Sequence, residues 1–92
     1  MKVIVRAKAE DDIVALFAWI AKDNTSAALD MVVRIRERIN MLATPGLSHL
    51  GHLGRVKGTL ELIEYPYTIV YAVREKKREI VILSIVHGAR DR

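Results

Sequence analysis

Two hydrophobic patterns follow one another in the first quarter of the chain. The run Val3-Ile4-Val5 is β-branched and bounded by charged residues, which is typical of a strand of about five residues. From Ala9 onward the apolar positions instead recur at helical spacing: Ile13, Leu16, Phe17 and Ile20. Acidic residues 10–12 precede them, where the helix dipole favours negative charge in a first turn. The pattern predicts a strand and then an amphipathic helix that ends near Lys22.

A second helical pattern begins after a cluster of turn and capping residues at 23–26. Its apolar positions form one stripe: Ala28, Val32, Ile35, Ile39 and Leu42. The charged residues at 34 and 36–38 fall mostly off this stripe, and Thr44-Pro45-Gly46 ends the helix. Because the connection between the two helices is short, they run roughly antiparallel and form a helical hairpin.

The second half of the chain has the composition of strands. Residues 47–54 contain turn formers without a period and predict a loop, after which strand-like runs follow at about 56–64, 67–74 and 79–87. Only Tyr65-Pro66 and residues 75–78 separate these runs, so the strands pair as antiparallel hairpins. The last run is apolar on both faces, as in a central strand covered on each side. The element order predicts an α+β fold, β-α-α-β-β-β, in which the helical hairpin packs on a curved antiparallel sheet.

The composition narrows the class of protein. The chain has 92 residues, of which 51% are hydrophobic and 28% charged, and this predicts a single globular domain over residues 1–92. There is no cysteine, so neither disulfides nor a thiolate zinc site can stabilise the small core, which favours a stabilising partner. The net charge of +4 favours an acidic partner such as nucleic acid or an acidic protein segment. Early charges and the lack of a long apolar run predict a cytoplasmic protein without a membrane partner.

Three strings in the second half carry a resemblance to a known family: residues 55–62 (RVKGTLEL), 67–73 (YTIVYAV) and 82–91 (ILSIVHGARD). Together with the upstream helical hairpin, they resemble the RelE/ParE superfamily of toxins from type II toxin-antitoxin systems, over nearly the whole chain. The resemblance implies a bacterial toxin that arrests growth and serves plasmid stabilisation. It also implies a heteromeric complex with a cognate antitoxin, whose carboxy-terminal segment wraps the toxin, and no cofactor.

The branches of this superfamily differ in their target. RelE-like members cut messenger RNA on the ribosome, and they usually carry an arginine before the "LVY" of the penultimate strand and a Tyr, Phe or His near the carboxy terminus. This chain has Thr68 at the first position and no aromatic residue after His87. Because ribonuclease chemistry needs a base, an acid and cations at the phosphate, the missing groups favour the ParE-like branch, whose members inhibit DNA gyrase. The alternatives are a ribosome-dependent mRNA endoribonuclease and a degenerate, non-toxic interaction module.

Candidate target-binding residues lie in the basic strings: Arg55, Lys57, His87, Arg90 and Arg92. An imidazole is suited to acid–base work near neutral pH, so His87 with Arg90, Arg55 and Lys57 would make a minimal ribonuclease site. The alternative is that His87 and Arg90 are structural. We expect a gyrase inhibitor that acts by binding rather than by catalysis.

The helices and the following loop contain more apolar side chains than the buried face of two helices requires. An amphipathic segment of the antitoxin could bind the excess, so the candidate antitoxin-binding residues are Trp19, Met31, Met41, Leu47 and Leu50. The alternative for a Met or aromatic residue at helical spacing is a place in the core. His49 and His52 have a spacing that, with His87, suggests a metal site. Because they lie in a glycine-rich loop without a nearby acidic residue, we interpret them as solvent-facing turn residues and predict no metal.

Overall fold

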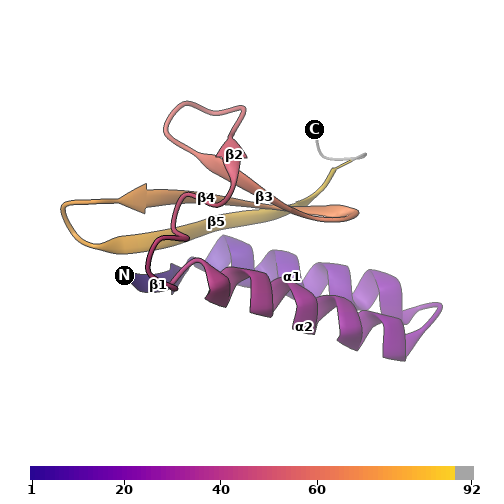
Figure 1. The fold of residues 1–92 in the computed structure, drawn as a ribbon. Coiled ribbons are helices and arrows are strands. Elements are labelled where there is room, and N and C mark those ends of the chain that lie inside the picture. The colour runs from indigo at the N-terminus through magenta and orange to yellow at the C-terminus, as the bar shows by residue number, and fades with distance from the viewer. Residues whose placement is uncertain (89–92) are drawn as a thin grey trace.

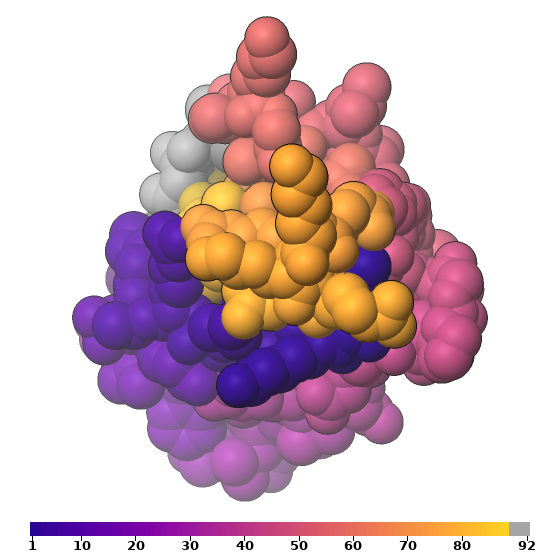
Figure 2. All heavy atoms as spheres, turned by 90° about the vertical axis from the view of Figure 1, so that its left-hand side faces the viewer, coloured from indigo at the N-terminus to yellow at the C-terminus, as the bar shows by residue number. Residues whose placement is uncertain are grey.

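The computed structural model describes residues 1–88, and all five strands in this range belong to one sheet. The elements, in chain order, are β1 (Lys2–Val5), α1 (Ala7–Ala21), α2 (Thr25–Met41), β2 (His52–Leu53), β3 (Leu60–Glu64), β4 (Tyr67–Arg74) and β5 (Glu79–His87). The strand order is β1-β5-β4-β3-β2, with β1 parallel to β5 and all other neighbours antiparallel. Both helices cover one face of the sheet, and the β2–β3 connection stands on the other side (Figures 1 and 2). The predicted α+β fold is confirmed.

The strands at 67–74 and 79–87 are confirmed, whereas the prediction for residues 47–64 is wrong in two places. Residues 54–59 form a loop rather than the start of a strand, because Gly54 N donates to Thr59 O (2.9 Å) and closes it. Gly58 has a φ of +85°, which an extended strand does not allow. The short strand β2 lies inside the predicted loop and pairs His52 with Glu61.

The helix α1 starts earlier than its apolar pattern indicates, so that of the three acidic residues only Glu10 belongs to the first turn. Glu10 accepts two hydrogen bonds from the Arg36 guanidinium on α2, at 2.6 and 3.2 Å. Asp12 Oδ2 accepts the backbone N–H of Ile85 on β5 (2.9 Å). These acidic residues therefore join α1 to α2 and to the sheet.

The Glu10–Arg36 pair makes stability depend on pH in the acidic range. The guanidinium lowers the pKa of Glu10 below its usual 4.5, so the pair stabilises the fold above that value, and the contribution is lost as the pH falls through the folded-state pKa. Both side chains are nearly half exposed, so solvent keeps the effect small. We predict that Glu10→Gln flattens the drop in melting temperature between about pH 5 and pH 3, measured by circular dichroism. Glu37→Gln, at an exposed position on α2, is the matched control, and an unchanged profile for Glu10→Gln would contradict the prediction.

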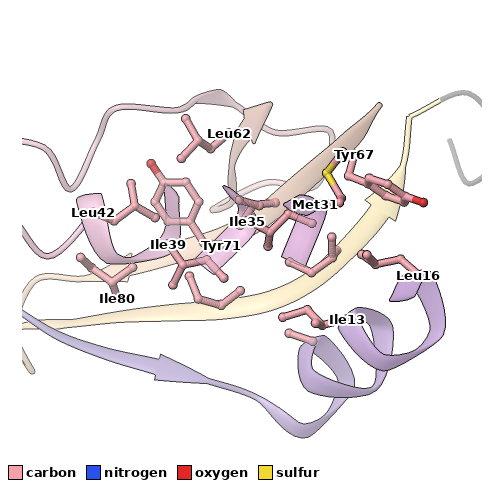
Figure 3. Packing of buried hydrophobic residues seen from close by; sticks show 14 residues of the cluster. Ile13, Leu16, Met31, Ile35, Ile39, Leu42, Leu62, Tyr67, Tyr71 and Ile80 are labelled. Atoms are coloured by element: carbon pink, nitrogen blue, oxygen red, sulfur yellow. The ribbon is translucent and has the colours of Figure 1, made fainter. Parts of the chain in front are cut away.

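The hydrophobic core lies between the helical hairpin and the facing side of the sheet (Figure 3). The predicted stripe of α2 is confirmed at Ala28, Ile35, Ile39 and Leu42, while Val32 is only partly buried. From the sheet the core receives seven large side chains: Leu62, Tyr67, Ile69, Tyr71, Ile80, Ile82 and Ile85. Within residues 1–88, neither helix has the length and apolar character that a membrane crossing requires.

A β-bulge in β5 decides which side chains face the helices. The ladder pairs Val70 with Ser84 and Tyr71 with Ile82, so Leu83 is an extra residue. Ile82 and Ile85 consequently both enter the core, although strict alternation would place them on opposite faces. β5 is confirmed as an interior strand, but the helices cover only one of its faces.

Charged side chains of the helices satisfy backbone groups where the sheet is left unpaired. β1 pairs with β5 only up to Ile82, and beyond that point Asp12 accepts the Ile85 N–H. On the other side, β2 pairs with β3 only at Leu60 and Glu61, and Arg38 Nη2 donates to the Ile63 carbonyl (3.1 Å). Each contact satisfies one backbone group that the short neighbouring strand leaves without a partner in the sheet.

Candidate functional site

The β2–β3 arm, which we define as residues 51–59, stands out from the sheet face opposite the helices (Figure 1). Its tip is closed by Thr59 N, which donates to Val56 O (3.1 Å). Two sheet residues hold its base: Glu61 Oε2 accepts Arg55 N–H (3.0 Å), and the Tyr71 hydroxyl accepts Gly51 N–H (3.0 Å). The arm is thus fixed by its own backbone and by the sheet.

Gly51 lies so close to the sheet that no larger residue fits without a shift. A Cβ at this position would be 2.6 Å from the Glu61 carbonyl oxygen and 2.9 Å from its carbon. Burial raises the pKa of the neighbouring Tyr71 above its usual 10.0, so the hydroxyl stays neutral near physiological pH. The base of the arm is therefore held by the close packing of Gly51 on the Glu61 backbone and by the hydrogen bond from Gly51 N–H to the neutral Tyr71 hydroxyl.

Glu61 is a buried carboxylate on the sheet face under the arm. It is only 3% exposed, and its Oε1 lies 3.8 Å from His52 Nε2 across the β2–β3 ladder. A groove of about 180 Å³ runs beside it between the arm and the sheet, lined by Arg55, Val56, Thr59, Glu61, Val70, Ser84 and Val86. Sequence reasoning missed Glu61, for which the only local signal is a glutamate inside a strand-forming run.

The structure brings two of the predicted target-binding residues together. Arg55 and Lys57 are both exposed on the arm. Arg90 and Arg92 lie outside the described residues. Of this group, the structure therefore describes the basic pair on the arm and His87.

His87 faces the helix side of the sheet at the end of β5, and one of the hollows that it lines also contains His52 of the arm. Its ring makes an edge-on contact with Tyr67, with 5.4 Å between ring centroids. It lines a hollow of about 280 Å³ beside α1 and another of about 560 Å³ beyond the β3–β4 turn. Strict alternation from Ile82 would have placed His87 on the arm side, and the extra residue Leu83 reverses this. None of the hollows described for residues 1–88 contains both His87 and Arg55, so the minimal ribonuclease set is not assembled there.

The predicted antitoxin-binding residues do not form one surface. Met31 is 6% exposed and packs in the core, which corrects its assignment to a free surface. Trp19 is 53% exposed near the carboxy end of α1, where the two helices are joined, and Lys22 Nζ lies 5.2 Å from its ring centroid. Met41 and Leu50 are exposed and Leu47 is half-buried, all at the opposite end of the antiparallel hairpin, where α2 ends.

His49 and His52 are directed to different carboxylates, and His52 lies in β2 rather than in the predicted turn. His49 Nε2 lies 3.4 Å from Glu75 Oε1, whereas His52 faces Glu61. In residues 1–88 no three side chains of metal-ligating type converge. The hypothetical trio of His49, His52 and His87 is not grouped in the described structure.

The family model described as "ParE toxin of type II toxin-antitoxin system, parDE" matches residues 3–92. The chain belongs to this ParE toxin family. It is 38% identical over 73 residues to "Putative toxin Y4kP" of Sinorhizobium fredii (strain NBRC 101917 / NGR234), a match that covers 77% of this chain and 71% of that relative. The resemblance to the RelE/ParE superfamily is thereby confirmed.

Two solved structures share the fold of this ParE-family chain. One is described as "Chromosomal ParDE TA system from P. aeruginosa" and aligns with a TM-score of 0.79 at 24% identity over 95% of each chain. The other is the toxin-antitoxin complex RelBE2 from Mycobacterium tuberculosis, with a TM-score of 0.58 at 20% identity over 94% of this chain and 95% of that one. At these identities the likeness concerns the fold alone.

Proposed function

We propose that this ParE-family toxin inhibits DNA gyrase by binding, and that a cognate antitoxin neutralises it. The observation that carries the proposal is the match to the ParE family model over residues 3–92. The two structural neighbours are described as a ParDE system and a RelBE2 toxin-antitoxin complex, which supports an antitoxin as partner. The toxin would act in the cytoplasm, arrest growth and serve plasmid stabilisation.

The geometry supports binding over ribonuclease chemistry. Phosphodiester cleavage needs an acid or base within about 3 Å of the reacting oxygen and cations on the same phosphate. Thr68, where RelE-like members carry an arginine, is uncharged and 4% exposed. His87 faces the helix side of the sheet, whereas Arg55 lines the groove on the other side.

The proposal is tested with purified gyrase acting on relaxed plasmid DNA, with and without the toxin. We expect loss of the supercoiled product and accumulation of cleaved DNA, both reversed by an excess of the cognate antitoxin. Full supercoiling at high excess of a folded sample would contradict the proposal. Translated messenger RNA would then be the substrate to examine, with primer extension to detect cleavage.

A further inference from the structure

The β2–β3 arm lies in a stretch of sequence that contains no acidic residue. Between Glu37 and Glu61 there is neither Asp nor Glu, whereas Arg38, Arg55 and Lys57 are basic. Glu61, the first acidic residue after the arm, is buried and engaged with the Arg55 backbone N–H. The exposed charge of the arm is therefore entirely positive, which is the electrostatic condition for contact with a polyanion.

Large apolar side chains alternate with the two cations on the arm. Leu53 is 85% exposed and Val56 66% exposed, the former being the most exposed large hydrophobic residue of the described chain. The hydrogen bonds from Gly54, Arg55 and Thr59 hold these side chains outward on a fixed backbone. These two apolar side chains lie beside both cations of the arm, so a partner of the arm would meet apolar surface and positive charge together.

The arm also stands clear of the rest of the molecule. Figure 2 shows the residues in its colour range at the end of the molecule remote from the helices. The projection carries Val56 and Lys57 at its tip, with Arg55 and Leu53 just before them. Exposed apolar groups beside cations match the way in which proteins insert apolar wedges at base steps while basic residues contact the adjacent phosphates. The arm carries no Phe, Tyr or Trp, the larger rings on which RNA bases stack, and the imidazole of His52 lies 3.8 Å from the buried Glu61 carboxylate.

We infer that the β2–β3 arm binds duplex DNA directly. Arg55 and Lys57 contact phosphates, and Leu53 and Val56 pack against the groove between them. The inference does not depend on gyrase inhibition, because the arm would contact DNA in the absence of any enzyme.

The test is fluorescence anisotropy with a labelled duplex of about 20 base pairs, over salt concentrations from about 50 to 200 mM. Each phosphate contact contributes about 0.9 to the slope of log affinity against log salt. We predict that the double variant Arg55→Ala/Lys57→Ala makes this slope shallower by about 2. Leu53→Ala/Val56→Ala should weaken binding without changing the slope, because it removes no charge.

The matched control is Lys76→Ala/Lys77→Ala on the exposed β4–β5 turn, which removes the same charge far from the arm in sequence. An equal loss of slope in the control would assign binding to overall charge and overturn the inference. The inference is also overturned if the folded wild type does not bind at the lowest salt, or if it prefers single-stranded RNA of equal length to the duplex. Because gyrase is absent from the assay, failure here leaves the proposed gyrase inhibition untouched, and the supercoiling assay decides that separately.

Discussion

Tyr71→Ala should lower the free energy of unfolding by about 3–5 kcal/mol, as expected for removal of a large aromatic side chain from a core. Tyr71 lies on β4, has no exposed surface and packs in the cluster between helices and sheet. Its hydroxyl also accepts the Gly51 N–H at the base of the arm. The substitution thus leaves a cavity and an unpaired backbone group together. In a domain of this size the melting temperature should fall by roughly 12 °C or more.

Two further variants separate these effects. Tyr71→Phe keeps the ring and removes only the acceptor of Gly51 N–H, so we expect a loss of about 1–3 kcal/mol. Tyr65→Ala is the matched control, because Tyr65 is 76% exposed at the β3–β4 turn and its loss should change stability by no more than about 0.5 kcal/mol. Urea denaturation followed by circular dichroism measures all three. A cost for Tyr65→Ala as large as that for Tyr71→Ala would show that burial does not govern the result.

The elements that the sequence predicts well are those with a long, regular pattern. The stripe of α2 keeps its helical period through Leu42, and β4 and β5 are uninterrupted strand-forming runs bounded by turns, so local preference and tertiary packing agree. Met31 is not part of the predicted stripe, yet it is buried, because the buried face of a helix is wider than a single line of residues. Met31 lies deep in the core while Val32, chosen by the spacing, is only partly buried.

The candidate site depends on contacts between residues that are far apart in the chain. Asp12 bonds to Ile85, 73 residues later, and Tyr71 bonds to Gly51 across the sheet, so no local pattern predicts either. A single extra residue, Leu83, turns His87 to the helix side of the sheet, and an apolar run gives no sign of which residue bulges. The sequence therefore identified the basic residues of the arm but not the face on which His87 stands.

The bulge places the strand-end His87 on the helix side of the sheet. His87 packs edge-on against Tyr67, which belongs to the core. The arm, by contrast, displays its cations and apolar groups on a backbone held by Glu61 and Tyr71. The DNA contact that we propose for the arm and the packing of the core thus lie on opposite sides of one sheet.

Ile35→Ala should lower the free energy of unfolding by about 2–5 kcal/mol, because it removes a side chain without exposed surface from the middle of α2. Domains of this length are stable by roughly 5–14 kcal/mol, so the loss is a large part of the total. Val33→Ala, two residues away and 54% exposed, is the matched control and should have little effect, since alanine favours the helix and no core contact is lost. Urea midpoints at a constant m-value measure both. Equal midpoints for the two variants would contradict the prediction, because they would mean that the buried side of α2 contributes no more to stability than its exposed side.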